Sequence, residues 1–403
     1  MQKSGGAVIR MKDTNIEWII GDENIKIFPL KPYSDIVIDF LDELSAMLRK
    51  KVIRGKYNDI GTLAFWCRRG NLLKLKENAG NLNNRLGRGL VFHITPSNVP
   101  INFAFSYFFG LLSGNSNAVR VPSKRFEQID IICDAVKAVL ENDRYKMIKE
   151  TTAFVRYGHD KEITDAFSMM ADARIIWGGD ASISEIRKSP MKSKGTEIVF
   201  ADRFSLGIIN SDEFDKLSEE DSDEFALRFY NDTYLMDQNA CSTPHLILWV
   251  GAKKEAAKVK LWSSVHKVAG QYNLKPIKAM DKYTDLCLSG CSNDIKKADR
   301  KDNLLYVVEL NELPEEIDKL RGSYGMFYQY DLENINNLAP YIDSKVQTLL
   351  YYGMDKNKLL SFVLDNHLQG IDRIVPFGKA LDIGVYWDGY DIVSQLSRIV
   401  CVN

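Results

Sequence analysis

The sequence predicts an α/β protein built on mainly parallel sheets. From about residue 88 onward, short β-branched runs alternate with longer runs of helical periodicity, which is the pattern of βα units. The first unit runs from a strand at 90–95 through a proline-containing turn at 96–100 into an apolar helix at 101–112. The chain has 403 residues, of which 45% are hydrophobic and 27% charged, and this is enough for two domains with their own cores.

The remaining elements follow from periodicity and capping. Ser34 is expected to cap a helix whose apolar residues recur at three- and four-residue steps; these are Val37, Ile38, Leu41, Leu44 and Leu48. Beyond the first unit we expect a helix around 129–140, and strands at 117–121, 153–157, 174–177, 206–210, 245–250, 304–309, 326–330 and 346–351.

These elements suggest a division of the chain. We expect a cofactor-binding domain at 1–204 with a leading helical segment, a catalytic domain at 205–382, and a C-terminal return or oligomerisation segment at 383–403. Ligands of open α/β sheets bind outside the carboxyl ends of the strands. The turns at Pro96, Pro122 and Gly178 are therefore expected to line the cofactor site, with the active-site crevice between the two domains.

Bulk properties exclude several classes of protein. The 53 basic and 54 acidic residues give a formal net charge of -1, so nucleic acid is not an expected partner. No apolar stretch approaches the roughly 20 residues of a membrane span, and the charged start has no signal-peptide core. We expect a cytoplasmic protein. Its six scattered cysteines are expected to be reduced thiols.

Common catalytic motifs are missing from the sequence. It has no Walker-type loop, no complete G-x-G-x-x-G after a strand and no G-x-S-x-G elbow. The five histidines lack the spacing of a helical zinc site, and Cys287-x-x-x-Cys291 has no second ligand pair. No metal is expected.

Cys241 stands out among the cysteines by its context. A lone cysteine is usually a small buried hydrophobe, but Cys241 lies in a turn of small polar residues before a strand. Asn98 alone could simply cap a turn beside two prolines. Together, an attacking thiolate and an amide donor from another strand end are the two parts that a tetrahedral oxyanion requires, with the Cys241 backbone N–H as second donor.

Four segments resemble the aldehyde-dehydrogenase superfamily. The stretch 238–241 is similar to its nucleophile loop, and 95–100 to its T-P-x-N-x-P turn, whose asparagine points at the reacting carbonyl. The stretch 120–124 resembles the segment beside the adenosine ribose, and 177–180 the turn near the pyrophosphate. The cofactor-binding residues that the resemblance implies are Thr95, Pro96, Arg120, Pro122, Ser123, Lys124, Trp177, Gly178 and Gly179.

The resemblance also bears on the cofactor and on assembly. Val121 replaces the usual lysine, while Lys124 stands where NAD-preferring members often carry glutamate, and Arg120 adds a second cation. Cations favour the 2′-phosphate of NADPH, whereas a carboxylate would accept the ribose hydroxyls of NADH. NADPH is thus the expected cofactor and NADH the alternative. Members usually form dimers or tetramers through a terminal arm, so a homo-oligomer is expected.

Within the superfamily, the chain looks most like the LuxC-type acyl-CoA reductases. The segments that carry this likeness are 93–100, 237–244, 370–378 and 387–390. It implies NAD(P)H-dependent reduction of an acyl-CoA or acyl-carrier thioester to an aldehyde, such as a fatty aldehyde, through a cysteine acyl-enzyme. It also suggests an acyl-protein synthetase as a partner.

One missing residue favours reduction over oxidation. Aldehyde-oxidising members activate water with a glutamate ahead of the cysteine, but the stretch 200–207 contains none, and Asp202 is shorter and lies beside Arg203. Two alternatives stay open. One is an acyl-phosphate reductase of the γ-glutamyl phosphate reductase type, which a basic anion pocket beside Cys241 would favour. The other is a noncatalytic acyl-carrying subunit.

Overall fold

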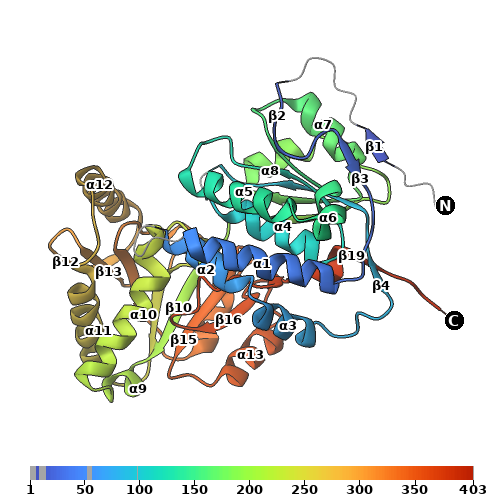
Figure 1. Ribbon diagram of the computed structural model, residues 1–403. Coiled ribbons are helices and arrows are strands. Elements are labelled where there is room, and N and C mark those ends of the chain that lie inside the picture. Colours follow the sequence, from blue (N-terminus) through green and yellow to red (C-terminus); the bar gives the residue numbers. More distant parts are fainter. Residues whose placement is uncertain (1–5, 9–14, 52–56, 98, 403) are drawn as a thin grey trace. The chain divides into compact units, whose positions relative to one another are not determined.

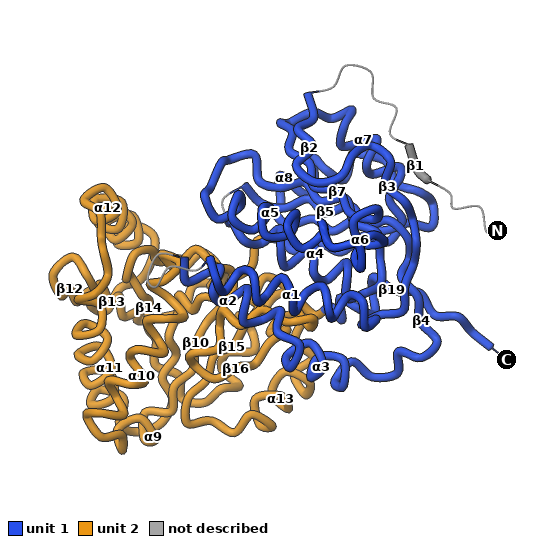
Figure 2. Tube along the Cα trace, viewed as in Figure 1, with its two compact units in different colours: residues 1–201, 390–403 blue, residues 202–389 orange. Residues whose placement is uncertain are grey.

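The computed structural model describes residues 6–8, 15–51, 57–97 and 99–402. The chain forms two compact units (Figure 2). Unit 1 comprises residues 1–201 and 390–403, and unit 2 comprises residues 202–389. Unit 1 is therefore assembled from both ends of the chain, and unit 2 from one continuous segment between them.

Unit 1 is built on a six-stranded sheet in which only one edge strand is antiparallel. In spatial order its strands are β2 (Glu17–Ile20), β7 (Thr152–Arg156), β6 (Ser116–Arg120), β5 (Leu90–Ile94), β8 (Ala173–Trp177) and β9 (Thr196–Phe200). Two small antiparallel pairs accompany it: β1 (Gly6–Val8) with β3 (Asn24–Lys26), and β4 (Arg85–Gly87) with β19 (Ser397–Ile399).

Helices cover both faces of this sheet (Figure 1). Successive residues of β5 show the alternation, since His93 contacts Ser106 of α4 whereas Phe92 stacks on Phe167 of α7. The helices of unit 1 are α1 (Asp35–Lys51), α2 (Asn58–Trp66), α3 (Arg69–Asn78), α4 (Asn102–Leu112), α5 (Glu127–Leu140), α6 (Lys146–Glu150), α7 (Lys161–Met170), α8 (Asp180–Ile186), α14 (Ile392–Gln395) and the 3₁₀ turn η1 (Asp143–Tyr145). A short strand, β18 (Tyr390–Asp391), precedes α14.

The strand order of unit 1 contains a topological switch. From β5 the chain adds β6 and then β7 on one side, and afterwards crosses to add β8 and β9 on the other. The loops after β5 and β8 therefore leave the sheet in opposite directions, which opens a crevice at their carboxyl ends where ligands of such sheets bind. The predicted turns at Pro96 and Gly178 follow these two strands.

Unit 2 contains a seven-stranded sheet, again parallel except at one edge. In spatial order the strands are β12 (Ile295–Lys301), β13 (Leu305–Leu310), β14 (Met326–Asp331), β11 (Pro244–Val250), β10 (Phe204–Asn210), β15 (Val346–Tyr352) and β16 (Arg373–Pro376). The strand β17 (Tyr386–Trp387) lies close to the end of the unit in sequence.

Two hydrophobic clusters fill the two faces of this sheet. One packs α10 and α11 against alternate strand residues such as Ile247 and Trp249, and the other packs α13 against Leu246 and Leu248. The helices are α9 (Ser211–Asp215), α10 (Glu219–Thr233), α11 (Lys254–Ala269), α12 (Pro276–Ser292) and α13 (Lys356–Asp365), with 3₁₀ segments η2 (Tyr234–Met236), η3 (Ile317–Lys319) and η4 (Ile335–Tyr341).

The fold class expected from the sequence is confirmed. The predicted strands and helices lie within a few residues of the observed ones, because each is a buried strand or an amphipathic helix of ordinary length. The prediction for Ser34 is wrong in one respect. Helix α1 does begin after it, but the buried Ser34 hydroxyl has no partner among the described residues, and its carbonyl accepts from the Val37 and Ile38 N–H groups instead.

No helix in the described part of the chain has both the length and the apolarity needed to cross a bilayer. The most apolar one, α4, lies buried within unit 1.

Gly110 offers a test of the packing between α4 and the sheet of unit 1. A Cβ added there would collide with Asn117 Oδ1 and would lie 2.9 Å from His93 Nε2. We expect Gly110→Ala to lower the free energy of unfolding by about 1–3 kcal/mol, because overpacking forces buried groups apart. Gly70→Ala in α3 is the control, since no described atom lies within 4 Å of its added Cβ. It should stabilise the unit by about 0.5–1 kcal/mol. Equal effects of the two substitutions in urea denaturation would contradict this account.

Candidate active site

Cys241 lies in unit 2, in the loop between η2 and the amino end of β11. Asp237 and Gln238, which precede it in this loop, have left-handed backbones although neither is glycine; their φ angles are 53° and 61°. The Gln238 side chain holds this conformation, because its Nε2 donates to the Met326 carbonyl at 2.9 Å and its Oε1 accepts from the Gly325 N–H at 2.6 Å. The glutamine of the predicted nucleophile motif therefore braces the loop against β14.

The loop is fixed again at the cysteine itself. The Cys241 carbonyl accepts a hydrogen bond from Ser205 Oγ at 2.7 Å, and that oxygen accepts from the Thr348 N–H at 3.2 Å. Ser205 and Thr348 lie near the amino ends of β10 and β15. Cys241 is thus tied to the strand beside its own and to the next one, at the amino-terminal edge of the parallel sheet.

The cysteines differ in exposure. Cys67 and Cys133 are buried, and Cys287, Cys291 and Cys401 are exposed, while Cys241 is partly buried. A partly buried thiol in a braced loop can be reached by a reactant and still be held in a defined direction.

Four polar side chains of unit 2 influence the pKa of the Cys241 thiol. Burial and, to a smaller extent, the Asp388 carboxylate raise the pKa of the Cys241 thiol to about 11, while a hydrogen bond from Gln347 and the charges of Arg373 and Arg203 act in the opposite direction. Gln347 Nε2 lies 3.4 Å from Sγ and also donates to Asp388 Oδ1. Burial raises the pKa of Asp388 to about 6.

Both arginines near Cys241 are already engaged. Arg203 forms an ion pair with Asp372. Arg373 donates to the carbonyls of Ala380 at 3.0 Å, Lys379 at 3.2 Å and Asp382 at 3.1 Å, and its guanidinium lies 4.3 Å from the centre of the Trp387 ring. With Asp388 also present, the surroundings of the sulfur are not a vacant basic pocket.

The segment after β16 is held by a buried carboxylate on α10. Asp232 accepts from the Gly378 N–H at 2.5 Å and from the Ala380 N–H at 3.0 Å, and burial raises its pKa to about 7. Its own carbonyl accepts from Thr243 Oγ1 at 2.8 Å. Asp232 therefore links the nucleophile loop to the segment that receives the Arg373 hydrogen bonds.

Asp202 pairs with Arg321 at 2.9 Å. Its carboxylate is therefore neutralised by a partner that the sequence did not indicate. A different carboxylate, that of Asp388, is the one that influences Cys241.

The predicted cofactor residues lie in three turns of unit 1, at the carboxyl ends of β5, β6 and β8. Some of them have structural partners. Thr95 Oγ1 donates to the Arg120 carbonyl at 2.8 Å, the Arg120 guanidinium donates to the Gly158 carbonyl at 2.8 Å, and the carbonyl of buried Pro122 accepts from Arg156 at 3.2 Å. These hydrogen bonds shape the turns and fix the positions of the predicted residues.

Trp177 is a structural residue as well. It is buried against Phe200, with ring centres 3.8 Å apart, and its indole N–H donates to Ser106 Oγ at 3.1 Å. Ser106 bonds to His93 Nδ1 at 2.8 Å, and His93 Nε2 bonds to Asn117 Oδ1 at 3.0 Å. Because an amide oxygen only accepts, Nε2 carries a proton, and because burial lowers the pKa of His93 to about 4, the imidazole is neutral at pH 7. The chain of bonds ties β8 to α4 and β5.

Other predicted residues are accessible. Pro96 and Gly178 are partly buried, and Ser123, Lys124 and Gly179 are exposed. The Lys124 ammonium lies 5.0 Å from the centre of the Phe126 ring. Gly179 has an ordinary backbone with φ -74°, and an added Cβ would meet no described atom within 4 Å. Gly179 is the N-cap residue of α8, a position that glycine favours, and the open space beside it leaves room for a ligand. Asn98 lies outside the described residues.

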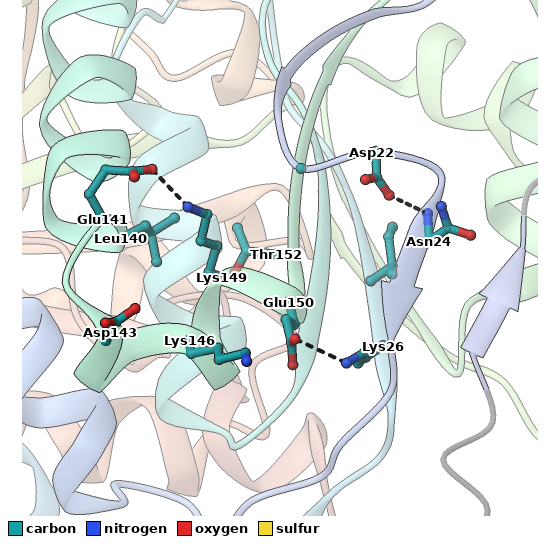
Figure 3. Close-up of a pocket in the computed structure, with 12 residues that line it drawn as sticks. Asp22, Asn24, Lys26, Leu140, Glu141, Asp143, Lys146, Lys149, Glu150 and Thr152 are labelled. Carbon is teal, nitrogen blue, oxygen red and sulfur yellow. Dashed lines mark hydrogen bonds and ion pairs between the residues drawn. The ribbon is translucent and has the colours of Figure 1, made fainter.

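Two other polar features of the described residues do not coincide with these positions. Glu255, Glu309 and Asp331 come close enough to hold a metal ion, but the Lys258 ammonium lies among them, within 3.2 Å of an oxygen of each. A cavity of about 460 Å³ in unit 1 is bordered by Thr152, at the amino end of β7, so it lies at the opposite sheet edge from the predicted turns. Its ion pairs, Lys149 with Glu141 and Lys26 with Glu150, are seen in Figure 3.

The family model for acyl-CoA reductase (LuxC) matches residues 30–400. The chain belongs to this family. The resemblance found in the sequence is thereby confirmed, and the match includes the Cys241 loop and the Gln347, Arg373 and Asp388 positions.

One curated relative of this LuxC-family chain is the long-chain acyl-protein thioester reductase of Vibrio harveyi. The two are 22% identical over 323 residues, which cover 78% of this chain and 63% of that protein. The chain thus spans less than two thirds of the length of this relative.

Solved structures show the aldehyde-dehydrogenase fold for this LuxC-family chain. A mutant 1-pyrroline-5-carboxylate dehydrogenase of Thermus thermophilus matches with a TM-score of 0.60 and 10% identity over 92% of this chain and 81% of that one. An NAD-dependent benzaldehyde dehydrogenase of Corynebacterium glutamicum matches with a TM-score of 0.59 and 10% identity over 91% of this chain and 84% of that one.

Sequence reasoning did not find Gln347 or Asp388. Gln347 lies inside a strand, where a polar residue among apolar ones was the available signal. Asp388 lies in the segment 387–390 that carried the family likeness, and Arg373 in the segment 370–378, but nothing in their spacing places them beside a cysteine far away in the chain.

The neutral His93 in unit 1 predicts a specific pH dependence of stability. Burial lowers its pKa from 6.5 to about 4, so its contribution is fully present above pH 6.5 and is lost as the pH falls through 4. At about 1.36 kcal/mol per pKa unit, we expect a loss of up to about 3 kcal/mol over this window. His93→Gln, which keeps a donor toward Asn117, should be less stable at pH 7.5 but lose less between pH 6.5 and 4. Urea denaturation at several pH values measures both slopes, and equal slopes would refute the assignment.

Proposed function

We propose that this LuxC-family protein reduces an acyl thioester to an aldehyde with a nicotinamide cofactor, and that Cys241 carries the acyl group. The observation that carries the proposal is the placement of Cys241, a partly buried thiol in a doubly anchored loop with an amide donor 3.4 Å from its sulfur. Such a thiol can be held in line with a carbonyl carbon and form a covalent acyl-enzyme.

Chemically, the Cys241 sulfur attacks the thioester carbonyl carbon, the new S–C bond forms, and the S–C bond to the donor thiol breaks. The thiol proton leaves with the donor sulfur. No described residue accepts a hydrogen bond from the Cys241 backbone N–H, which supports its proposed role as an oxyanion donor. Asn98 is proposed as the second donor.

A nicotinamide dinucleotide would supply the hydride, and we propose that unit 1 binds it at the turns following β5, β6 and β8. The switch in strand order at β5 and the open space beside Gly179 support this site. Within it, Lys124 is the exposed cation proposed to favour NADPH over NADH. Thr95, Arg120, Pro122 and Trp177 shape these turns and are proposed to line the same site.

The charges around Cys241 favour a thioester over an acyl phosphate. Arg203 is neutralised by Asp372, Arg373 is occupied by main-chain carbonyls, and Asp388 adds a carboxylate. A phosphate leaving group would meet a negative charge there without an unoccupied cation. Acyl-CoA and protein-bound acyl thioesters both fit the proposed substrate class. A synthetase partner and self-association stay predictions.

Cys241→Ala tests the nucleophile. With acyl-CoA of several chain lengths and NADPH, we expect cofactor oxidation and aldehyde formation to fall at least about 1000-fold, because removing a nucleophile removes the covalent path. Intact-protein and peptide mass spectrometry should find the acyl group on Cys241. Cys291→Ala removes an exposed thiol of the same unit and should leave the rate unchanged. Acylation without NADPH consumption for any donor would instead support an acyl-carrying subunit.

Lys124→Glu tests the cofactor preference. A carboxylate would repel the 2′-phosphate, so we expect kcat/KM for NADPH to fall about tenfold or more while that for NADH changes little. Lys137→Glu on α5 makes the same charge change at another exposed site of unit 1 and should leave the ratio as it was. A parallel fall for both cofactors in Lys124→Glu would remove the assignment of Lys124 to the phosphate.

A further inference from the structure

Gln347 donates a hydrogen bond to the Cys241 sulfur. It lies on β15, is fully buried, and its Nε2 is 3.4 Å from Sγ. The same nitrogen donates to Asp388 Oδ1, and Oε1 of Gln347 accepts from Thr348 Oγ1 at 3.2 Å. An amide nitrogen has two hydrogens, so one is available for each acceptor.

The charge of Asp388 determines which end of the amide faces the sulfur. An ionised carboxylate only accepts hydrogen bonds, so the amide nitrogen and not the oxygen must lie against it. In this orientation Oε1 accepts a hydrogen bond from the Thr348 hydroxyl. The second N–H is then directed to Cys241.

We propose that Gln347 is a catalytic residue, which donates a hydrogen bond to the Cys241 sulfur whenever that sulfur is negatively charged, and that Asp388 is the positioning residue that keeps the amide in its donating orientation. The inference rests on the proposed role of Cys241 as nucleophile. It adds Gln347, which lies outside the sequence motifs, and gives a role to Asp388, which the sequence did not single out.

The sulfur carries negative charge at two points of the proposed reaction. The first is the attack, when the thiol has given up its proton and the S–C bond to the acyl group forms. The second is the release of the aldehyde, when that S–C bond breaks and its electron pair returns to sulfur. The acylated sulfur is neutral between these points. A donor at 3.4 Å therefore stabilises the charged states more than the neutral acyl-enzyme, which is the condition for catalysis.

Asp388 has two opposed effects on the sulfur. Its carboxylate raises the pKa of the Cys241 thiol, while the amide that it orients lowers it, as do Arg373 and Arg203. Arg203 is itself paired with Asp372. Removing the Asp388 carboxylate should therefore change the pKa of the Cys241 thiol by a different amount when Gln347 is present than when it is absent.

The test measures thiolate formation directly, by the rate of iodoacetamide alkylation of Cys241 against pH, read by peptide mass spectrometry. We expect Gln347→Leu to raise the apparent thiol pKa by about one unit and to slow alkylation at pH 8 about tenfold. Gln347→Glu, of nearly the same shape but with an acceptor only, should slow it further.

Gln329→Leu is the matched control. Gln329 is also a buried glutamine of the unit 2 sheet, bonded to Trp249, Trp262 and Glu309, and it has no bond to Cys241. This variant should lose stability while its Cys241 pKa stays unchanged. An unchanged alkylation profile in folded Gln347→Leu would overturn the proposal for Gln347.

A double-mutant cycle tests Asp388. In Gln347→Leu the carboxylate only repels the thiolate, so Asp388→Asn should speed alkylation. With Gln347 present, the loss of the orienting charge offsets this gain, so Asp388→Asn should speed alkylation clearly less. Equal gains in both backgrounds would show that Asp388 acts on sulfur without Gln347.

The failure of this inference is distinguishable from failure of the proposed function. Alkylation requires neither an acyl donor nor a cofactor. If the alkylation profiles follow the expectation but neither acyl-CoA nor a protein-bound acyl thioester acylates Cys241, the proposed function fails. If Cys241 is acylated and the profile of Gln347→Leu equals that of the unchanged protein, the inference fails alone.

Discussion

The anchoring of one loop to the amino-terminal edge of the unit 2 sheet is the interaction on which the candidate chemistry depends. Two consecutive non-glycine residues, Asp237 and Gln238, adopt left-handed backbones that are costly by themselves. The Gln238 side chain offsets this cost with two hydrogen bonds, one to the Met326 carbonyl and one from the Gly325 N–H. Through Ser205, the Cys241 carbonyl is then fixed to a neighbouring strand. Loss of either anchor would leave a thiol in the same sequence but without a defined direction.

The two units use opposite edges of their parallel sheets. In unit 1 the predicted ligand turns follow the carboxyl ends of β5, β6 and β8, as expected for an open α/β sheet. In unit 2 the cysteine and its contacts Ser205 and Gln347 lie at the amino ends of β11, β10 and β15. Strand ends are where side chains of distant residues meet, so both arrangements collect polar groups on rigid supports.

Much of the fold was predictable from the sequence, because buried parallel strands and amphipathic helices leave clear periodic signals. Cys241 and the turns around Pro96 and Gly178 were recognisable from local motifs. Gln347 and Asp388 were not, because their importance comes from contacts between residues far apart in the sequence. Gln347 meets Cys241 106 residues away and Asp388 41 residues away. Trp177, predicted to lie beside the cofactor, also joins β8 to α4 through a hydrogen bond that the sequence did not indicate.

The division of the chain has a consequence for the order in which it folds. The segment 390–403 belongs to unit 1, where β19 pairs with β4 and the Asn115 amide donates to the Leu396 carbonyl at 2.9 Å. During synthesis from the amino terminus, unit 2 is therefore complete before unit 1 receives its last strand. The segment 390–403 acts as a closing segment, because its strand pairs with β4 more than 300 residues earlier in the chain. A ribosome-bound or truncated protein would leave the β4 edge of unit 1 unpaired.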